Sequence, residues 1–319
     1  MKNTKITIVG AGNVGAQTAF LALAKRLGDV VLIDIQEGVV KGKALDLQQT
    51  TALLQTEMTV TGTTDYKLTK NSDLVIVTAG IPRKPGMSRD DLIEVNAKIM
   101  KDVINNVVKY SPKCILIIVS NPLDEMVYLA KKLSKFPKQR IIGMAGILDT
   151  TRYKTFLAQA LHVKTQDIGG IVLGGHGDTM VPLLRLTTVK RKPISKSLSE
   201  KKIKEIIKHT QEAGGEIVTL LGTSAYYAPA AAIIEMVQSI LKDEKKVLPC
   251  CAELTGEYGC KNVFIGVPCV LGKKGVEKII ELKLNTSEKK LFLKTVDHVK
   301  SLYSIVDSVE FDNLEYEFK

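Results

Sequence analysis

His176 is the residue of this 319-residue sequence whose surroundings best suit acid–base chemistry. It stands in the segment Gly174-Gly175-His176-Gly177-Asp178, where flanking glycines leave the imidazole accessible to a substrate. An imidazole with an ordinary pKa of about 6.5 exchanges protons with a hydroxyl group near neutral pH. The other histidines lie in helical patterns typical of structural or solvated side chains: His162, His209 and His298. A glycine-flanked histidine is often structural, so a catalytic role for His176 needs support from further residues.

A glycine-rich turn near the start of the chain could bind a phosphate group. The segment Gly10-Ala11-Gly12-Asn13-Val14-Gly15 joins a predicted strand, Lys5–Val9, to a predicted helix, Val14–Leu27. In such a turn the first glycine allows the tight bend, the second lets a pyrophosphate approach, and the third lets the helix pack on the strand. The N–H groups at the start of the helix then face the anion. The alternative, a loop with incidental glycines, is disfavoured by this strand–turn–helix context.

A carboxylate at the end of the next predicted strand, Val30–Asp34, indicates which dinucleotide binds. Asp34 can accept hydrogen bonds from both hydroxyl groups of an adenine ribose. The same charge repels a 2′-phosphate, and the following Ile35 and Gln36 supply no arginine to receive one. We therefore predict NAD rather than NADP as the cofactor.

Short apolar runs alternate with helical patterns through the first half of the chain. Its further predicted elements are a helix over Gly38–Leu54, a strand over Asp73–Thr78, a helix over Asp90–Tyr110 and a strand over Cys114–Val119. The strands are continuously apolar, which is typical of strands covered on both faces. This alternation predicts an α/β fold with a doubly wound parallel sheet, the Rossmann arrangement, over residues 1–145.

The pattern changes after residue 145 and predicts an α+β substrate domain over residues 146–319. Its predicted elements are helices over Asp149–Leu161, Ile203–Leu221, Ala228–Leu241 and Ser287–Leu302, a strand over Ile168–Leu173, and paired strands over Val247–Leu254 and Val263–Val270. No low-complexity linker separates the two halves, so we expect the domains to pack tightly.

Composition argues against several classes of function. No run of about 18 apolar residues is present, which disfavours a membrane partner. The five cysteines have no metal-binding spacing, so we expect no metal site and reduced thiols in a cytoplasmic protein. The formal net charge of +11 suggests nucleic-acid binding as an alternative. Because the lysines are spread over many predicted helix faces without interleaved aromatic residues, we expect no nucleic-acid partner.

Five motifs occur in the order found in the lactate and malate dehydrogenases. They are Gly10–Gly15, Asp34, Ser120-Asn121-Pro122, Leu148–Arg152 and Gly175–Asp178. The sequence resembles that family from residue 4 to about residue 305, which is nearly the whole chain. Five ordered motifs are far more specific than any one alone, and the resemblance implies NAD-dependent oxidation of a 2-hydroxy acid.

The resemblance implies roles for three polar side chains. His176 would accept the proton of the substrate hydroxyl group, and Asp149 would orient the imidazole and stabilise its charge. Arg152, on the same predicted helix face as Asp149, would bind the C1 carboxylate of the substrate through two hydrogen bonds. Without the other motifs, Asp149 and Arg152 would be interpreted as an ordinary ion pair on a helix.

Further site residues follow from the resemblance. Asn121 would orient the reacting oxygen and contact the nicotinamide side of the cofactor. Ser224 would lie near the nicotinamide and the substrate, although a serine at the start of a helix is more often a cap. The implied cofactor-binding residues are Gly10, Gly12, Asn13, Val14, Gly15, Asp34, Asn96 and Asn121.

The segment from Gly80 to Arg89 is expected to decide the substrate. Its two prolines and two glycines predict a stiff loop that can hinge over the site. By resemblance, Arg89 would polarise the substrate carbonyl group when the loop closes. Arg83 stands where lactate dehydrogenases carry glutamine, and it would pair with the second carboxylate of malate or oxaloacetate, which pyruvate lacks. We therefore expect malate as the substrate; lactate, with Arg83 a plain surface residue, is the alternative.

The resemblance also implies a homo-oligomer, a tetramer rather than a dimer. From another class of function, a non-catalytic NAD-binding or nucleic-acid-binding protein is the remaining alternative. Such a protein would keep the glycine turn but would not need His176, Asp149 and Arg152 together. The sequence suggests no function for the acidic segment after about residue 303.

Overall fold

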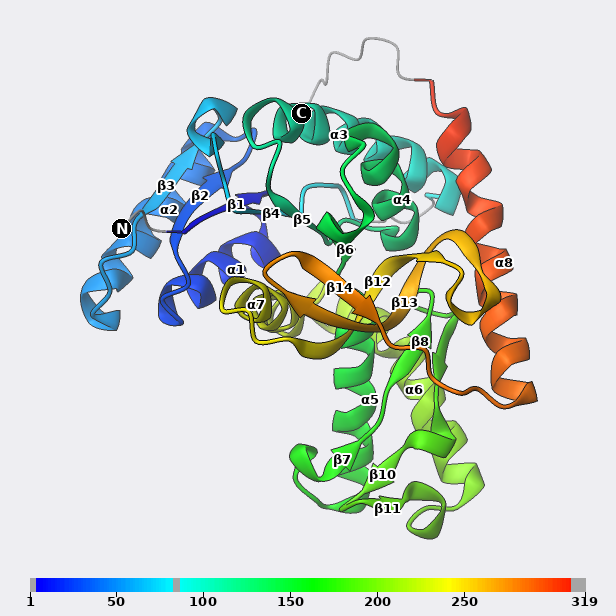
Figure 1. The fold of residues 1–319 in the computed structure, drawn as a ribbon. Helices are drawn as coiled ribbons and strands as arrows, with labels where there is room; N and C mark the ends of the chain where they lie inside the picture. Colours follow the sequence, from blue (N-terminus) through cyan, green and yellow to red (C-terminus); the bar gives the residue numbers. More distant parts are fainter. Residues whose placement is uncertain (1–3, 83–86, 311–319) are drawn as a thin grey trace.

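The computed structural model describes residues 4–82 and 87–310, and the first half of the chain forms a parallel sheet with helices on both faces (Figure 1). Its elements are β1 (Lys5–Val9), α1 (Asn13–Ala24), β2 (Asp29–Ile33), α2 (Glu37–Leu54), β3 (Val60–Thr63), β4 (Leu74–Val77), α3 (Arg89–Tyr110), β5 (Ile115–Ile118), α4 (Leu123–Ser134) and β6 (Ile141–Gly143). Each strand and helix predicted for this half is present, with small differences at the ends. The additional strands are the partly exposed edge strand β3 and the three-residue β6, which are too short or too polar to give an apolar run.

The parallel strands are covered on both faces, as their continuous apolar character predicts. On β4, Ile76 lies in the same hydrophobic cluster as Leu23 of α1, whereas Val77 lies in the cluster that contains Ile104 of α3. All four side chains are buried. Successive residues of a strand point to opposite faces, so a strand between two helical layers favours apolar residues on both faces.

The strand order of this half is β3-β2-β1-β4-β5-β6, with parallel pairing throughout. This order confirms the doubly wound parallel sheet. The chain order reverses between β1 and β4, and a crevice opens at the carboxyl ends of strands at such a point. Gly10 follows β1 and Thr78 follows β4 at that edge, so a ligand site is expected there.

The second half of the chain combines helices with antiparallel strands, and part of it extends below the sheet in Figure 1. Its elements are α5 (Gly146–Leu161), β7 (Ile168–Gly169), β8 (Val172–Gly174), β9 (Met180–Pro182), β10 (Thr188–Val189), β11 (Lys192–Pro193), α6 (Glu200–Leu221), α7 (Tyr227–Leu241), β12 (Lys246–Thr255), β13 (Lys261–Gly272), β14 (Gly275–Ile279) and α8 (Thr286–Ser308). β12 and β13 pair with each other, as predicted.

The prediction of a single strand over Ile168–Leu173 is wrong. β7 joins a three-stranded sheet with β10 and β11, whereas β8 belongs to the main sheet. Gly169 and Gly170 interrupt the apolar run, and glycine weakens a strand and lets the backbone change direction. The last helix ends at Ser308, beyond the predicted end at Leu302.

One sheet connects the two halves. In the described residues it continues from β6 to β12 through the pair of Gly143 with Cys251, then to β13, β8 and β9, and β14 pairs with β13. Glycine permits this close pairing, because a Cβ atom at position 143 would lie 2.7 Å from Cys251 Cβ. Strand pairing therefore fixes the second half against the first, and the domain boundary after residue 145 stays a prediction.

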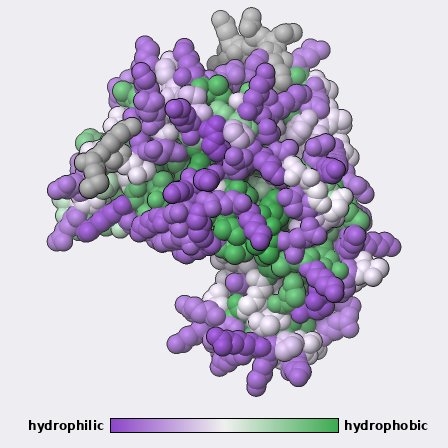
Figure 2. Space-filling model, viewed as in Figure 1, coloured by the Kyte–Doolittle hydropathy of each residue, from purple (hydrophilic) through white to green (hydrophobic). Residues whose placement is uncertain are grey.

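The face of the molecule in Figure 2 is mainly hydrophilic, and hydrophobic residues gather chiefly where the lower part joins the rest. Among the helices of residues 4–82 and 87–310, none is long and apolar enough to cross a membrane. Lysines on α6 pair with acidic residues nearby on the helix, as Lys204 does with Glu200. Part of the positive charge is thus used in exposed local ion pairs.

Candidate active site

The glycine turn after β1 has the geometry expected of a phosphate-binding loop. Gly10 adopts a φ of +104°, a conformation that residues with side chains disfavour. A Cβ atom at Gly15 would lie 1.9 Å from the Gly10 carbonyl oxygen, so α1 can approach this closely only with glycine there. Gly12 is the N-cap of α1 without a side-chain cap, and a Cβ atom there would meet nothing within 4 Å. The first N–H groups of α1 therefore face space that an anion can fill.

Asp34 lies beside this turn, directly after β2. Its Oδ2 atom accepts a hydrogen bond of 2.6 Å from the N–H of Ala11, and its Oδ1 atom accepts one of 3.2 Å from the N–H of Gln36. These bonds fix the carboxylate next to the glycine turn. A negative charge there suits the ribose hydroxyl groups of NAD and repels the 2′-phosphate of NADP.

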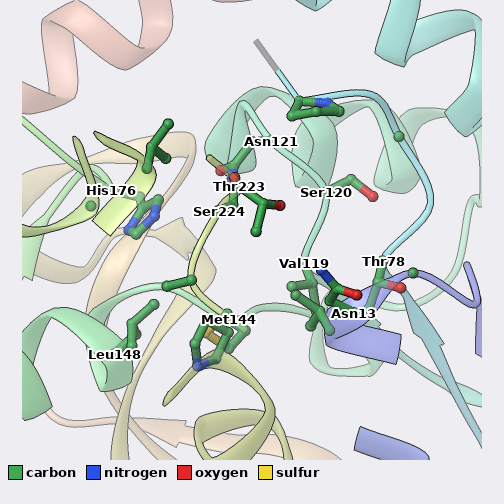
Figure 3. A pocket seen from close by; sticks show the side chains of 18 of the residues that line it. Asn13, Thr78, Val119, Ser120, Asn121, Met144, Leu148, His176, Thr223 and Ser224 are labelled. Atoms are coloured by element: carbon green, nitrogen blue, oxygen red, sulfur yellow. The ribbon is translucent and has the colours of Figure 1, made fainter. Parts of the chain in front are cut away.

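A cavity of about 440 Å³ extends from the glycine turn to His176 (Figure 3). Figure 3 shows Asn13 and Thr78 on one side, His176 on the other, and Ser224 between them. The predicted site residues that line the cavity are Gly12, Asn13, Val14, Gly15, Asn121, Arg152, His176 and Ser224. The fold therefore brings residues from both halves of the chain into one space.

His176 and Asp149 form a hydrogen-bonded pair at the wall of this cavity. The Nδ1 atom of His176 lies 3.0 Å from Asp149 Oδ2; the carboxylate is buried on α5, and the imidazole side chain is 20% exposed. Since Nδ1 is occupied, Nε2 is the nitrogen left for a substrate. Burial lowers the pKa of His176, but the charge and hydrogen bond of Asp149, together with the charge of Asp124, raise it, and the net result is a pKa above the ordinary value. The pair can therefore hold and release a proton beside a bound ligand.

Arg152 stands one turn after Asp149 on α5 and also faces the cavity. Its Nη1 atom lies 3.9 Å from Asp149 Oδ1, which is too long for a hydrogen bond. Within the described residues, that oxygen is buried without a hydrogen-bond partner. The guanidinium group is thus only weakly paired with Asp149, and its N–H groups can donate two hydrogen bonds to the carboxylate of a ligand.

Two family models match this chain. The model for the lactate/malate dehydrogenase NAD binding domain covers residues 4–143, and the model for the alpha/beta C-terminal domain of these enzymes covers residues 147–309. The chain is also 52% identical to a malate dehydrogenase of Cytophaga hutchinsonii over 307 residues, which are 96% of this chain and 98% of that protein. The chain belongs to the lactate/malate dehydrogenase family. NAD is therefore its cofactor, and the open N-terminus of α1 together with Asp34 fits that molecule.

Solved structures of the family share nearly the whole fold of this chain. Malate dehydrogenase from Cryptosporidium parvum is 46% identical, with a TM-score of 0.93 over 97% of this chain and 100% of that chain. Lactate dehydrogenase from the same organism, complexed with lactic acid and nicotinamide adenine dinucleotide, is 39% identical, with a TM-score of 0.94 over the same shares. The backbone alone therefore does not separate the two activities, and particular side chains must do so.

Asn96 is predicted to contact the cofactor, but its side chain has other partners. Its Oδ1 atom accepts a hydrogen bond of 2.8 Å from the N–H of Ile81, and its Nδ2 atom donates one of 2.6 Å to the carbonyl oxygen of Asn121. The side chain is buried and does not line the cavity. Asn96 therefore joins the loop after β4 to the loop after β5, and a direct contact with NAD stays a prediction.

Arg89 does not line the cavity, although it is predicted to act on the substrate. It begins α3, where its Nη2 atom lies 3.0 Å from Oε1 of the buried Glu125 and its Nη1 atom lies 3.3 Å from His298 Nε2. A role at the substrate requires the guanidinium group to leave Glu125, and it stays a prediction. Arg83, the residue predicted to select the second carboxylate, lies outside the described residues.

The glycines beside His176 differ in their surroundings. A Cβ atom at Gly175 would lie 2.6 Å from Thr179 Oγ1 and 3.2 Å from Asp124 Oδ2. At Gly177, which has a φ of +87°, such an atom would meet nothing within 4 Å. The prediction that both glycines open access to a substrate is therefore wrong for Gly175. The space that a side chain would take there is filled by Thr179 and Asp124.

Several cavity residues are absent from the sequence prediction. Thr78 and Gly80 follow β4, Met144 follows β6, and Gly214 and Thr223 come from the second half of the chain. The position of Thr78 at the carboxyl end of a predicted parallel strand is a signal that could have identified it. No local pattern marks Gly214 or Thr223, because their approach to the cavity depends on how α6 packs.

Proposed function

We propose that this chain catalyses the NAD-dependent interconversion of malate and oxaloacetate. The observation that carries the proposal is the hydrogen bond between His176 and Asp149, at the wall of a cavity that Arg152 and the glycine turn also line. Support for malate comes from the Cytophaga hutchinsonii relative, a malate dehydrogenase that is 52% identical.

His176 carries the proton of the reaction. In malate oxidation its Nε2 atom takes the proton of the C2 hydroxyl group, and Asp149 balances the charge of the imidazolium that forms. NAD, when bound, supplies the acceptor for the hydride on C2. In the reverse direction, protonated His176 donates this proton to the carbonyl oxygen of oxaloacetate. The raised pKa of His176 keeps that protonated form available near neutral pH.

Arginines bind both carboxylates in this proposal. Arg152 takes the C1 carboxylate, and its place at the cavity wall supports this role. Arg83 pairs with the second carboxylate; the support is its position six residues before Arg89, where lactate dehydrogenases of the family carry glutamine. Arg89 leaves Glu125 and polarises the reacting oxygen.

The other predicted site residues position substrate and cofactor. Asn121 and Ser224 line the cavity and would lie against the reacting oxygen and the nicotinamide. The turn from Gly10 to Gly15 would hold the pyrophosphate on the N–H groups of α1. Asp34 would bind the adenine ribose.

The test is NADH oxidation by the purified protein with oxaloacetate and, separately, with pyruvate. We expect oxaloacetate to be preferred by about 10³-fold in kcat/KM, because pyruvate leaves the Arg83 charge without a partner. Arg83→Gln should relax or reverse the preference, whereas the matched control Lys84→Gln, which removes the neighbouring charge, should retain it. Preference for pyruvate would refute the choice of substrate, and activity with neither compound would refute the proposed reaction.

We further propose that the active species is a homotetramer. The support is apolar surface on two helices: Leu45 and Leu53 of α2 are 63% and 89% exposed, and Leu220 and Leu221 of α6 are 76% and 55% exposed. Burying such residues against a second copy stabilises association. Sedimentation equilibrium should give four times the mass of one chain, and Leu53→Glu should give smaller species whereas Leu68→Glu should not. A monomeric wild-type protein would contradict this proposal.

The proposed location is the cytoplasm, and the proposed reaction would place the protein in the tricarboxylic acid cycle. All five cysteines lie in the described residues, and each is a buried free thiol. Free thiols are typical of reducing compartments. Fractionation of the source cells, followed by immunoblotting, would test the location.

A further inference from the structure

A second buried carboxylate contacts the loop that carries His176. Asp124 lies in the first turn of α4 and is 4% exposed. Its Oδ2 atom accepts a hydrogen bond of 3.0 Å from the backbone N–H of His176, and its Oδ1 atom accepts one of 3.2 Å from Cys251 Sγ. Gly175 permits this approach, since a Cβ atom there would lie 3.2 Å from Asp124 Oδ2. Both carboxylate oxygens of Asp124 therefore have a partner. Oδ2 supports the loop that carries His176, and Oδ1 binds Cys251 on β12.

Asp124 is not paired with an arginine or lysine among the residues that the structure describes. Its neighbour Glu125 is equally buried but pairs with Arg89 at 3.0 Å. The cation that acts on Asp124 is His176 in its protonated form. A buried carboxylate needs hydrogen bonds or a nearby positive charge to stay ionised, so the charge of Asp124 is linked to the proton on His176.

The electrostatics of the two groups agree with this link. Burial, and then repulsion by Glu125, raises the pKa of Asp124 to about 6, while hydrogen bonds from His176 and Cys251 act in the opposite sense. Above that pH the carboxylate is mostly charged, and its charge raises the pKa of His176, as that of Asp149 does. The titratable or charged groups that face this pair are Glu125 on α4, Asp149 and Arg152 on α5, Cys251 on β12 and Tyr303 on α8.

We propose that Asp124 is a positioning residue of the reaction, which fixes the His176 backbone through Oδ2 and favours the protonated imidazole through its charge. The kinetic consequence rests on the proposed function, because protonated His176 is the form that reduces oxaloacetate. The effect on His176 itself does not depend on the substrate. Cys251 assists, since its S–H group stabilises the ionised carboxylate from the other side.

Asp124→Asn removes the charge of the side chain but keeps its size, and the amide oxygen can still accept a hydrogen bond from the His176 N–H. The variant therefore distinguishes the effect of the charge from that of the hydrogen bond. NMR titration of histidine-labelled protein resolves at most four imidazoles, and the variant His176→Gln identifies the resonance of His176. We expect its titration midpoint to move to lower pH in Asp124→Asn, while His162, His209 and His298 keep theirs. Asp167→Asn removes one negative charge from the turn Thr165–Asp167, which does not line the cavity, and should leave all four midpoints unchanged. An unmoved His176 midpoint in a folded Asp124→Asn protein would overturn the proposal.

Steady-state kinetics provide a second test of the role of Asp124. For oxaloacetate reduction we expect kcat/KM of Asp124→Asn to fall about tenfold at about pH 8.5, with a smaller loss at about pH 6, because acid favours protonated His176 in both proteins. A loss equal at both pH values would indicate a purely structural role and would overturn the electrostatic assignment. If neither protein reduces oxaloacetate but the NMR midpoint moves, the proposed function fails while the inference about Asp124 stands.

Cys251 provides an independent test in case Asp124→Asn does not fold. Cys251→Ala removes the S–H donor and makes Asp124 easier to protonate, so the His176 midpoint should move to lower pH. Cys251→Ser retains a donor and should restore the wild-type midpoint. Equal midpoints in Cys251→Ala and wild type would contradict the proposal.

Discussion

Replacing Asp149 with asparagine tests the central pair of the site. The variant keeps the size of the side chain and removes a negative charge 3.0 Å from His176 Nδ1. With an effective dielectric constant of about 20, two unit charges at that separation interact by about 5 kcal/mol. Relief of the desolvation of a buried carboxylate offsets part of this, so we expect a loss of about 3–5 kcal/mol, or about 10²–10⁴-fold in kcat/KM for oxaloacetate. An amide NH₂ group turned toward Nδ1 would also impose the wrong imidazole tautomer.

The same variant has a characteristic pH dependence. In the wild-type protein, burial lowers the pKa of His176, and Asp149 and Asp124 raise it, so that the net shift is upward. Asp149→Asn removes the contribution of Asp149, so the pKa falls. Oxaloacetate reduction needs the protonated imidazole and should therefore be lost at lower pH in the variant. Malate oxidation needs the neutral imidazole, so its acidic limb should also move to lower pH.

The assay is the change in NADH absorbance in both directions across the pH range. Asp178→Asn is the matched control, because Asp178 is an exposed carboxylate two residues from His176. The control should keep its rate and its pH profile within a small factor. An Asp149→Asn enzyme with a near-wild-type kcat/KM and an unshifted profile would refute the reasoning, because the hydrogen-bonded charge would then contribute nothing to proton transfer.

Three further variants test the other parts of the site. Arg152→Lys keeps the charge but loses the pair of parallel N–H donors of the guanidinium group, so KM for oxaloacetate should rise about 10–100-fold. Fluorescence titration should show an unchanged NADH affinity. An unchanged KM would contradict the role assigned to Arg152. Gly15→Ala places a Cβ atom 1.9 Å from the Gly10 carbonyl oxygen. Its unfolding free energy, measured with urea, should fall by about 1–3 kcal/mol with weaker NADH binding, and a wild-type value would be the opposing result. Asp34→Asn removes a charge that repels a 2′-phosphate, so the NADPH-to-NADH activity ratio should rise at least about tenfold; a constant ratio would exclude this role.

Features that depend on neighbours along the chain could be predicted from the sequence alone. The spacing of Gly10, Gly12 and Gly15 defines a turn within six residues, and steric limits on those backbone positions leave little choice of geometry. Continuous apolar runs identified β2, β4 and β5, since a strand between two helical layers is buried on both faces. The choice of His176 also followed from local context, because only this histidine of the four lies between glycines.

Contacts between groups that lie far apart along the chain depend on how the elements pack. Asp149 and Asp124 lie 27 and 52 residues from His176 along the chain, and only the packing of α4 and α5 brings them to its two sides. The sequence motif contained Asp149, whereas nothing in the sequence near Asp124 marked that residue as functional. The partners of Arg89 and Asn96 also depend on packing, because a long or amide side chain takes the partners that the surrounding elements place within reach. Local sterics and periodicity are encoded residue by residue, but the pairing of buried polar groups is selected by the free energy of the whole packed arrangement.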